Sequence, residues 1–194
     1  YAIGREFHGG RARVTVSVAN FVPKPHTPFQ WRPQAGLAEI REKQEFLRRR
    51  LAGAGKGLAF SWHEAELSFL EGVFARGDRR LAAVLTEAFR LGCRFDAWPD
   101  KFRWDLWQQA FAAVGLDPEF YTARSRPRDE ILPWSHLSAG VSTDYLWEEN
   151  CRAEKGIPTP DCRDRHCTGC GVCVLYDLPF PPVKRVKAGG GQDV

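Results

Sequence analysis

Methionine is absent from this sequence of 194 residues, even at its first position. We interpret the sequence as a fragment of a longer chain, because the opening stretch from Tyr1 to Gly10 resembles neither a signal peptide nor a transit peptide. The sequence also lacks any apolar run that approaches the length of a membrane span. We therefore expect a soluble, cytoplasmic protein.

A strong excess of charge of one sign is missing as well. The chain has 28 Lys and Arg against 24 Asp and Glu, which gives a net charge of +4. The densest basic run, Arg48 to Arg50, falls at the end of a predicted helix, where cations complement the helix dipole. Charge alone therefore does not indicate a nucleic-acid-binding protein.

Cysteine is sparse along most of the chain, yet four of the six cysteines fall near its end in the pattern C-x4-C-x2-C-x2-C. A secreted disulfide scaffold would spread its cysteines along the chain, so the clustering favours a metal site. Four thiolates suit zinc or an iron–sulfur cluster, and the spacing leaves both open. His166 is an alternative zinc ligand. The predicted ligands are Cys162, Cys167, Cys170 and Cys173.

The periodicity of apolar residues predicts an α/β protein. Val14, Val16 and Val18 alternate with polar residues, which is typical of a strand, and residues 58–62 read as a second strand. Residues 37–51 between them have helical spacing. A strand, a helix and another strand indicate a βαβ unit with parallel strands. Further helices are predicted over 68–75, 78–91, 102–114 and 142–155, followed by coil.

A proline-rich loop, Pro23 to Pro28, follows the first predicted strand and contains Lys24 and His26. In a parallel barrel the loops that follow the strands build the active site. A stiff loop there would hold a ligand contact in place, while a purely structural turn is an equally good interpretation.

Three segments together resemble a known family: Val16 to Trp31, Phe69 to Leu81, and Pro160 to Cys173. They resemble the C-terminal part of an uncharacterised bacterial radical SAM family, whose members often carry a cobalamin-binding-like domain before the radical SAM domain. Ile131 to Trp134 and Leu146 to Asn150 resemble the same family. The resemblance covers nearly the whole chain.

The resemblance implies that residues 1–64 form the last strands of a partial TIM-type barrel, with Lys24 and His26 near its cofactor or substrate end. It implies a helical family-specific extension over 65–157. A Cys-rich metal-binding segment would follow over 158–183, and a disordered tail over 184–194. The intact enzyme would bind S-adenosylmethionine and a [4Fe–4S] cluster through the missing N-terminal portion. RNA or a ribosomal component is one candidate substrate.

Two alternatives to an enzyme fragment remain open. In the first, the cysteines bind a structural zinc in a module that docks on RNA or on a protein partner. In the second, the chain is an α/β domain with a structural zinc and no chemistry of its own.

The sequence also lacks the CxxxCxxC motif through which radical SAM enzymes bind their catalytic cluster. We therefore expect that this chain alone does not cleave S-adenosylmethionine. The check is to reconstitute the chain with iron and sulfide and to incubate it with the cofactor and a reductant. Formation of 5′-deoxyadenosine would refute the expectation.

Overall fold

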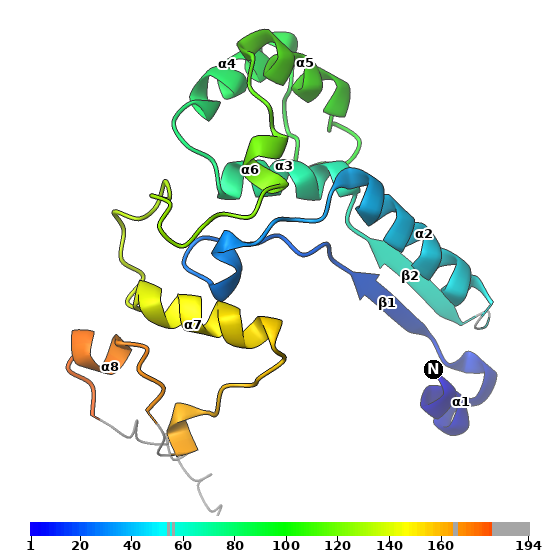
Figure 1. The fold of residues 1–194 in the computed structure, drawn as a ribbon. Coiled ribbons are helices and arrows are strands. Elements are labelled where there is room, and N and C mark those ends of the chain that lie inside the picture. Colours follow the sequence, from blue (N-terminus) through cyan, green and yellow to red (C-terminus); the bar gives the residue numbers. More distant parts are fainter. Residues whose placement is uncertain (54, 56, 165–166, 180–194) are drawn as a thin grey trace, which may run out of the picture. The chain divides into compact units, whose positions relative to one another are not determined.

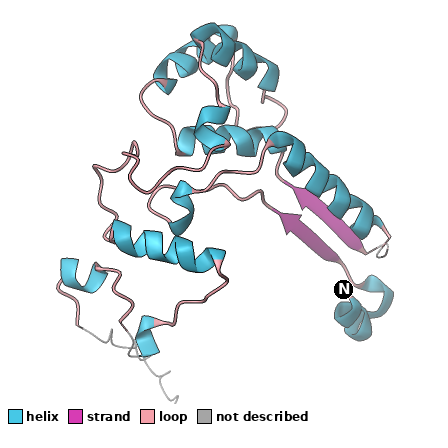
Figure 2. Ribbon diagram, in the orientation of Figure 1, coloured by secondary structure: helices cyan, strands magenta, loops and turns pink. Residues whose placement is uncertain are grey.

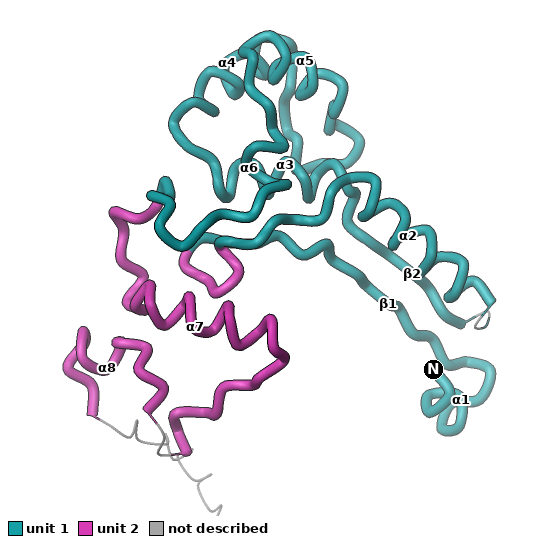
Figure 3. Tube along the Cα trace, in the orientation of Figure 1, with its two compact units in different colours: residues 1–25, 31–133 teal, residues 26–30, 134–194 magenta. Residues whose placement is uncertain are grey.

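The computed structural model describes residues 1–53, 55, 57–164 and 167–179, and it separates into two compact units (Figure 3). Unit 1 comprises residues 1–25 and 31–133, and unit 2 comprises residues 26–30 and the chain from residue 134 onward. The predicted disorder of 184–194 and the predicted role of His166 fall outside the described residues. The domain boundaries expected at 64/65 and 157/158 stay a prediction. No helix of the described residues has the length and hydropathy needed to cross a bilayer.

The predicted βαβ unit is confirmed (Figures 1 and 2). Strand β1 (Val14–Val18) pairs in parallel with β2 (Leu58–Trp62), and the connection between them contains helix α2 (Leu37–Ala52). The register places Val14 opposite Leu58 and Val18 opposite Trp62. The valines of β1 are half-buried while the residues between them are exposed, so the period of two in the sequence is also the period of burial.

The expected partial TIM-type barrel is wrong. The described residues contain one sheet, and it has only the strands β1 and β2. Barrel strands are buried on both faces and are nearly continuous apolar runs. Thr15 and Ser17 interrupt β1 on one face and are exposed. After β2 the chain enters helix α3 (Ala65–Ala75) almost at once, and the later described elements are helical.

The core of unit 1 lies among helices. Helices α3, α4 (Leu81–Leu91), α5 (Trp104–Val114) and α6 (Glu119–Thr122) enclose it. Gly92 and Gly115 end α4 and α5 in the left-handed conformation, with φ of 106° and 71°, which glycine adopts without a steric penalty. The predicted helices over 78–91 and 102–114 are thus confirmed, with shorter bounds. The buried core residues are Phe69, Leu70, Val73, Leu81, Val84, Ala88, Cys93, Trp107, Ala110, Phe111 and Tyr121.

A buried arginine joins three segments of unit 1 that are distant in the sequence. Arg76 follows α3 and is 0% exposed. Its Nη1 donates to the carbonyl oxygen of Arg32 at 2.7 Å, and its Nη2 donates to that of Thr122 at 3.1 Å. The Thr122 oxygen also accepts the backbone N–H of Gln34 at 2.8 Å. One guanidinium therefore supplies donors to carbonyl groups that helical or sheet bonding does not satisfy.

The cost of burying this charge is visible in its pKa. Burial, followed by the positive charges of Arg126 and Arg124, lowers the pKa of Arg76 to about 10. No carboxylate of the described residues forms an ion pair with Arg76. The side chain nevertheless stays charged at neutral pH, because its pKa lies well above 7. Any contribution of Arg76 to the stability of the fold must therefore come from its hydrogen bonds to backbone oxygens.

We expect Arg76→Met to lower the free energy of unfolding by about 1–3 kcal/mol, because the carbonyl oxygens of Arg32 and Thr122 each lose the hydrogen bond from Arg76. The stability of Arg76→Lys should lie between that of the parent chain and that of Arg76→Met. An ammonium group cannot reach both carbonyl oxygens in the same geometry. Urea unfolding followed by tryptophan fluorescence measures the change. The matched control is Arg79→Met, at an exposed position near Arg76. If Arg76→Met proved as stable as the parent chain, the cost of burying the charge would equal or exceed the worth of its hydrogen bonds.

Candidate functional site

The four predicted metal ligands lie in unit 2, after helix α7 (Thr143–Glu154). Ser142 begins that helix, and its Oγ accepts the backbone N–H of Tyr145 at 3.2 Å. The backbone N–H of Ser142 donates to the carbonyl oxygen of Cys170 at 2.9 Å. The end of the cysteine segment is therefore attached to the start of α7 by a backbone hydrogen bond.

Two glycines turn the chain between the last three cysteines. Gly169 and Gly171 have φ of 75° and 88°, a left-handed conformation that L side chains rarely adopt. The N–H of Gly169 lies 3.4 Å from Sγ of Cys167, within hydrogen-bonding distance for sulfur. Gly171 then begins the short helix α8 (Val172–Leu175), which contains Cys173. Hydrogen bonds to sulfur stabilise thiolate ligands, so this local geometry suits a metal-binding turn.

The thiols of the motif are accessible to solvent, but their side chains do not converge on one point. Cys167 is exposed, the other three motif cysteines are half-buried, and all four are free thiols. Among the described residues, no group of three or more His, Cys, Asp or Glu side chains is arranged to hold a metal ion. The donor chemistry thus fits a thiophilic metal, whereas the side-chain positions do not enclose one. The four-cysteine site stays a prediction.

Lys24 and His26 have separate local roles. Lys24 belongs to unit 1, is exposed, and forms an ion pair with Glu71 of α3. His26 belongs to unit 2, has a φ of 56°, and donates its backbone N–H to Oε1 of Gln30 at 3.0 Å. The geometry at His26 is that of a structural turn. Cofactor binding by either residue stays a prediction.

Gln30 is a residue that sequence reasoning missed. It is 3% exposed, and its Oε1 accepts Nε1 of Trp134 at 2.7 Å in addition to the N–H of His26. One buried amide oxygen therefore joins the proline-rich loop to a residue more than a hundred positions later within unit 2. The contact with His26 is local, but the sequence around Gln30 does not predict the bond to Trp134, which depends on tertiary structure.

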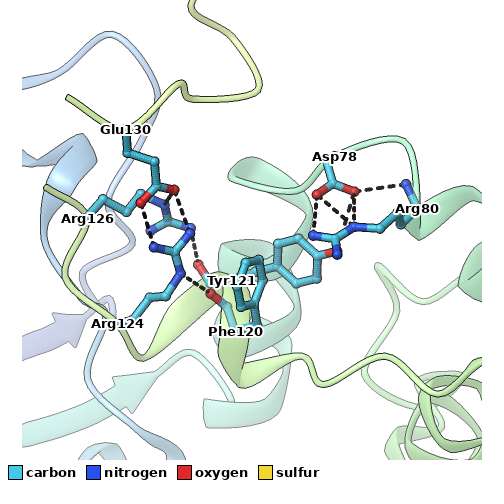
Figure 4. A network of polar contacts seen from close by, with 7 residues as sticks. All are labelled: Asp78, Arg80, Phe120, Tyr121, Arg124, Arg126 and Glu130. Carbon is cyan, nitrogen blue, oxygen red and sulfur yellow. Dashed lines mark hydrogen bonds and ion pairs between the residues drawn. The ribbon is translucent and has the colours of Figure 1, made fainter. Parts of the chain in front are cut away.

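The sequence analysis also missed a charged and aromatic cluster in unit 1 (Figure 4). Arg124 forms two hydrogen bonds with the Glu130 carboxylate, at 2.7 and 2.6 Å. The guanidinium carbons of Arg124 and Arg80 lie 4.4 and 5.3 Å from the centre of the Phe120 ring, which is typical of cation–π contacts. Arg80 also binds Asp78, with Nη2 to Oδ2 at 2.7 Å.

The pKa shifts of Glu130 and Asp78 do not suit these carboxylates to acid–base catalysis near neutral pH. The hydrogen bond from Arg124 lowers the pKa of Glu130, and that from Arg80 lowers the pKa of Asp78. Both carboxylates therefore stay ionised at pH 7, whereas a general acid or base works best with a pKa near the operating pH. The cluster is a structural support for α6 and the chain that follows it.

Comparison of the sequence with protein-family models, curated proteins and solved structures finds no match in any of the three.

We expect Glu130→Gln to destabilise the chain by about 1 kcal/mol at neutral pH, through loss of the partly buried pair with Arg124. Because the folded pKa of Glu130 lies below its unfolded value, this stabilisation is present above the unfolded pKa and is lost as pH falls through the folded pKa. The difference from the parent chain should therefore shrink as the pH falls below the ordinary pKa of an unfolded glutamate, about 4.3. Urea unfolding at several pH values measures it.

The matched control for this test is Asp129→Asn, which removes an exposed neighbouring carboxylate that no described ion pair involves. A deficit in Glu130→Gln that kept its full size at the lowest pH would show that the charge of the pair contributes nothing.

Proposed function

We propose that this chain is the C-terminal part of a radical SAM enzyme and that Cys162, Cys167, Cys170 and Cys173 bind an auxiliary iron–sulfur cluster or a zinc ion. The observation that carries the proposal is the turn from Cys167 to Cys173, where both intervening glycines have positive φ and an N–H lies against a cysteine sulfur. Cysteines separated by two residues on such a turn can bring their thiolates to one centre. The resemblance described above supplies the enzyme class.

Accessibility supports a site whose ligands an incoming metal ion can reach. Each motif cysteine is at least partly exposed, so an incoming metal ion or a scaffold protein can reach the sulfur atoms. Cys170 is bonded to the start of α7 through Ser142, and Asp161 accepts the backbone N–H of Arg163 within the segment. Metal sites commonly form together with the local fold, and side chains then converge only when the ion binds.

The chemistry of an auxiliary site follows from its ligands. An iron–sulfur cluster would relay an electron or anchor a substrate, whereas zinc would stabilise the local fold. In this proposal S-adenosylmethionine and the catalytic cluster bind to the radical SAM portion of the intact enzyme. The residues described here supply the auxiliary ligands and the backbone turn that positions them.

The alternative function is a zinc-stabilised binding module, and one observation favours a protein partner over RNA. Helix α8 follows the cysteine turn and exposes apolar side chains: Val174 is 89% exposed and Leu175 is 57% exposed. Exposed apolar groups of this kind suit a protein interface, whereas RNA binding requires cations and stacking surfaces. An affinity for RNA that falls steeply with salt would instead favour RNA.

We expect the chain purified without oxygen to carry either iron with sulfide or about one zinc ion per chain, because four thiolates complete one site. The double variant Cys167→Ala, Cys170→Ala should lose nearly all of this metal. Ultraviolet–visible spectra and elemental analysis measure both results. A broad brown absorbance identifies a cluster, and a colourless protein with zinc identifies a structural ion.

The matched control is Cys151→Ala, which removes a half-buried thiol of α7 that precedes the motif. The proposal is refuted if the double variant keeps as much metal as this control. It is also refuted if the parent chain takes up neither metal on anaerobic reconstitution.

A further inference from the structure

Unit 1 contains a cleft of about 350 Å³ that the cysteine motif does not involve. It lies among the start of α2 and helices α3, α5 and α6, which are neighbours in Figure 1. This volume falls within the range of small-molecule sites. The lining residues used in the argument are Leu37, Phe69, Trp104, Phe111, Asp117 and Glu119.

The apolar walls of the cleft are already organised. Phe69 and Phe111 are each 3% exposed and belong to the core. Phe69 meets Trp104 edge to face, with ring centres 5.8 Å apart and planes at 82°. Trp104 also stacks with Phe102 at 6.5 Å. Because these rings are held by core packing, a ligand would not have to order them, which lowers the cost of binding.

All the charge in the walls is negative. Asp117 and Glu119 line the cleft, whereas no lysine, arginine or histidine is among the residues described as lining it. The Asp117 carboxylate is oriented by the backbone N–H of Glu119, which donates to its Oδ1 at 2.9 Å. Arg103 precedes Trp104, but its guanidinium is bound to Asp105 at 2.9 and 2.6 Å. The carboxylates at the cleft are thus without a cationic side chain in its walls.

We propose that this cleft binds a small organic cation with an apolar body. The ammonium group is attracted by the carboxylates of Asp117 and Glu119, and the Trp104 ring in the cleft wall is the candidate for a cation–π contact. The apolar body packs against Phe69, Phe111 and Leu37. Aromatic rings with carboxylates are the combination that proteins use for ammonium ligands. A neutral ligand of the same shape gains binding free energy only from the apolar contacts. An anion is repelled by the two carboxylates.

The test uses three probes of matched shape on the whole chain: 2-phenylethylammonium, the neutral 2-phenylethanol and the anionic 3-phenylpropionate. Binding is measured by calorimetry and by shifts of the tryptophan indole N–H resonances in NMR spectra. We expect the cation to bind about five- to tenfold more tightly than the alcohol, which corresponds to about 1 kcal/mol from the charge contacts. The anion should show no saturable binding.

Two variants locate the site. Asp117→Asn with Glu119→Gln should remove the preference for the cation while binding of the alcohol persists. Ala112→Phe fills the cleft from an exposed position of α5 that lines it, and it should abolish binding of all probes. The control Glu42→Gln removes a carboxylate from α2 that does not line the cleft, and it should leave the affinities unchanged.

Equal affinity for cation and alcohol, or a cation preference that survives the double variant, would overturn the proposal. Binding unaffected by Ala112→Phe would overturn it too, since the probe would then lie elsewhere. Binding of a lysine-containing peptide without binding of the free ammonium probe would replace the small ligand with a protein partner. Each variant is first checked for a cooperative urea transition like that of the parent chain.

Discussion

The hydrogen bonds of the Arg76 guanidinium are the interaction on which the arrangement of unit 1 most depends. This side chain is wholly buried and donates to backbone oxygens of two segments, one before α2 and one at the end of α6. Arg32 lies in a loop and Thr122 is the last residue of α6, so neither carbonyl oxygen is satisfied by a sheet or by the helix itself. A charged group that is buried without a carboxylate is costly, so its geometry must be well defined for the arrangement to persist.

Other features of unit 1 follow from this contact. Thr122 ends α6, so the donation from Arg76 holds α6 close to the end of α3. The cleft needs that arrangement, because Phe69 of α3 and Glu119 of α6 are both among its lining residues. The Arg124–Glu130 pair then continues the support just beyond α6. Unit 1 thus combines an apolar helical core with a set of hydrogen-bonded arginines, Arg76 and Arg124, close to α6.

Unit 2 depends on a different kind of contact. Its described cysteine segment is shaped by local backbone geometry at Gly169 and Gly171 and by the bond between Ser142 and Cys170. Few buried apolar side chains belong to this part of the chain. A segment with little core of its own commonly takes its stability from a bound metal ion. The proposed metal site and the proposed cation cleft are therefore independent, since they lie in different units and rest on different chemistry.

The sequence by itself determined the elements that depend on neighbouring residues. The period of two from Val14 to Val18 and the helical spacing of α2 sufficed to predict a parallel βαβ unit. Tertiary structure alone decided whether further strands would join the sheet, and the resemblance to a barrel family misled on this point. It also decided the partners of Arg76, the contact of Gln30 with Trp134 and the lining of the cleft. The physical reason is range: periodicity and φ preference act over a few residues, whereas a buried guanidinium finds its acceptors about 45 positions away in either direction.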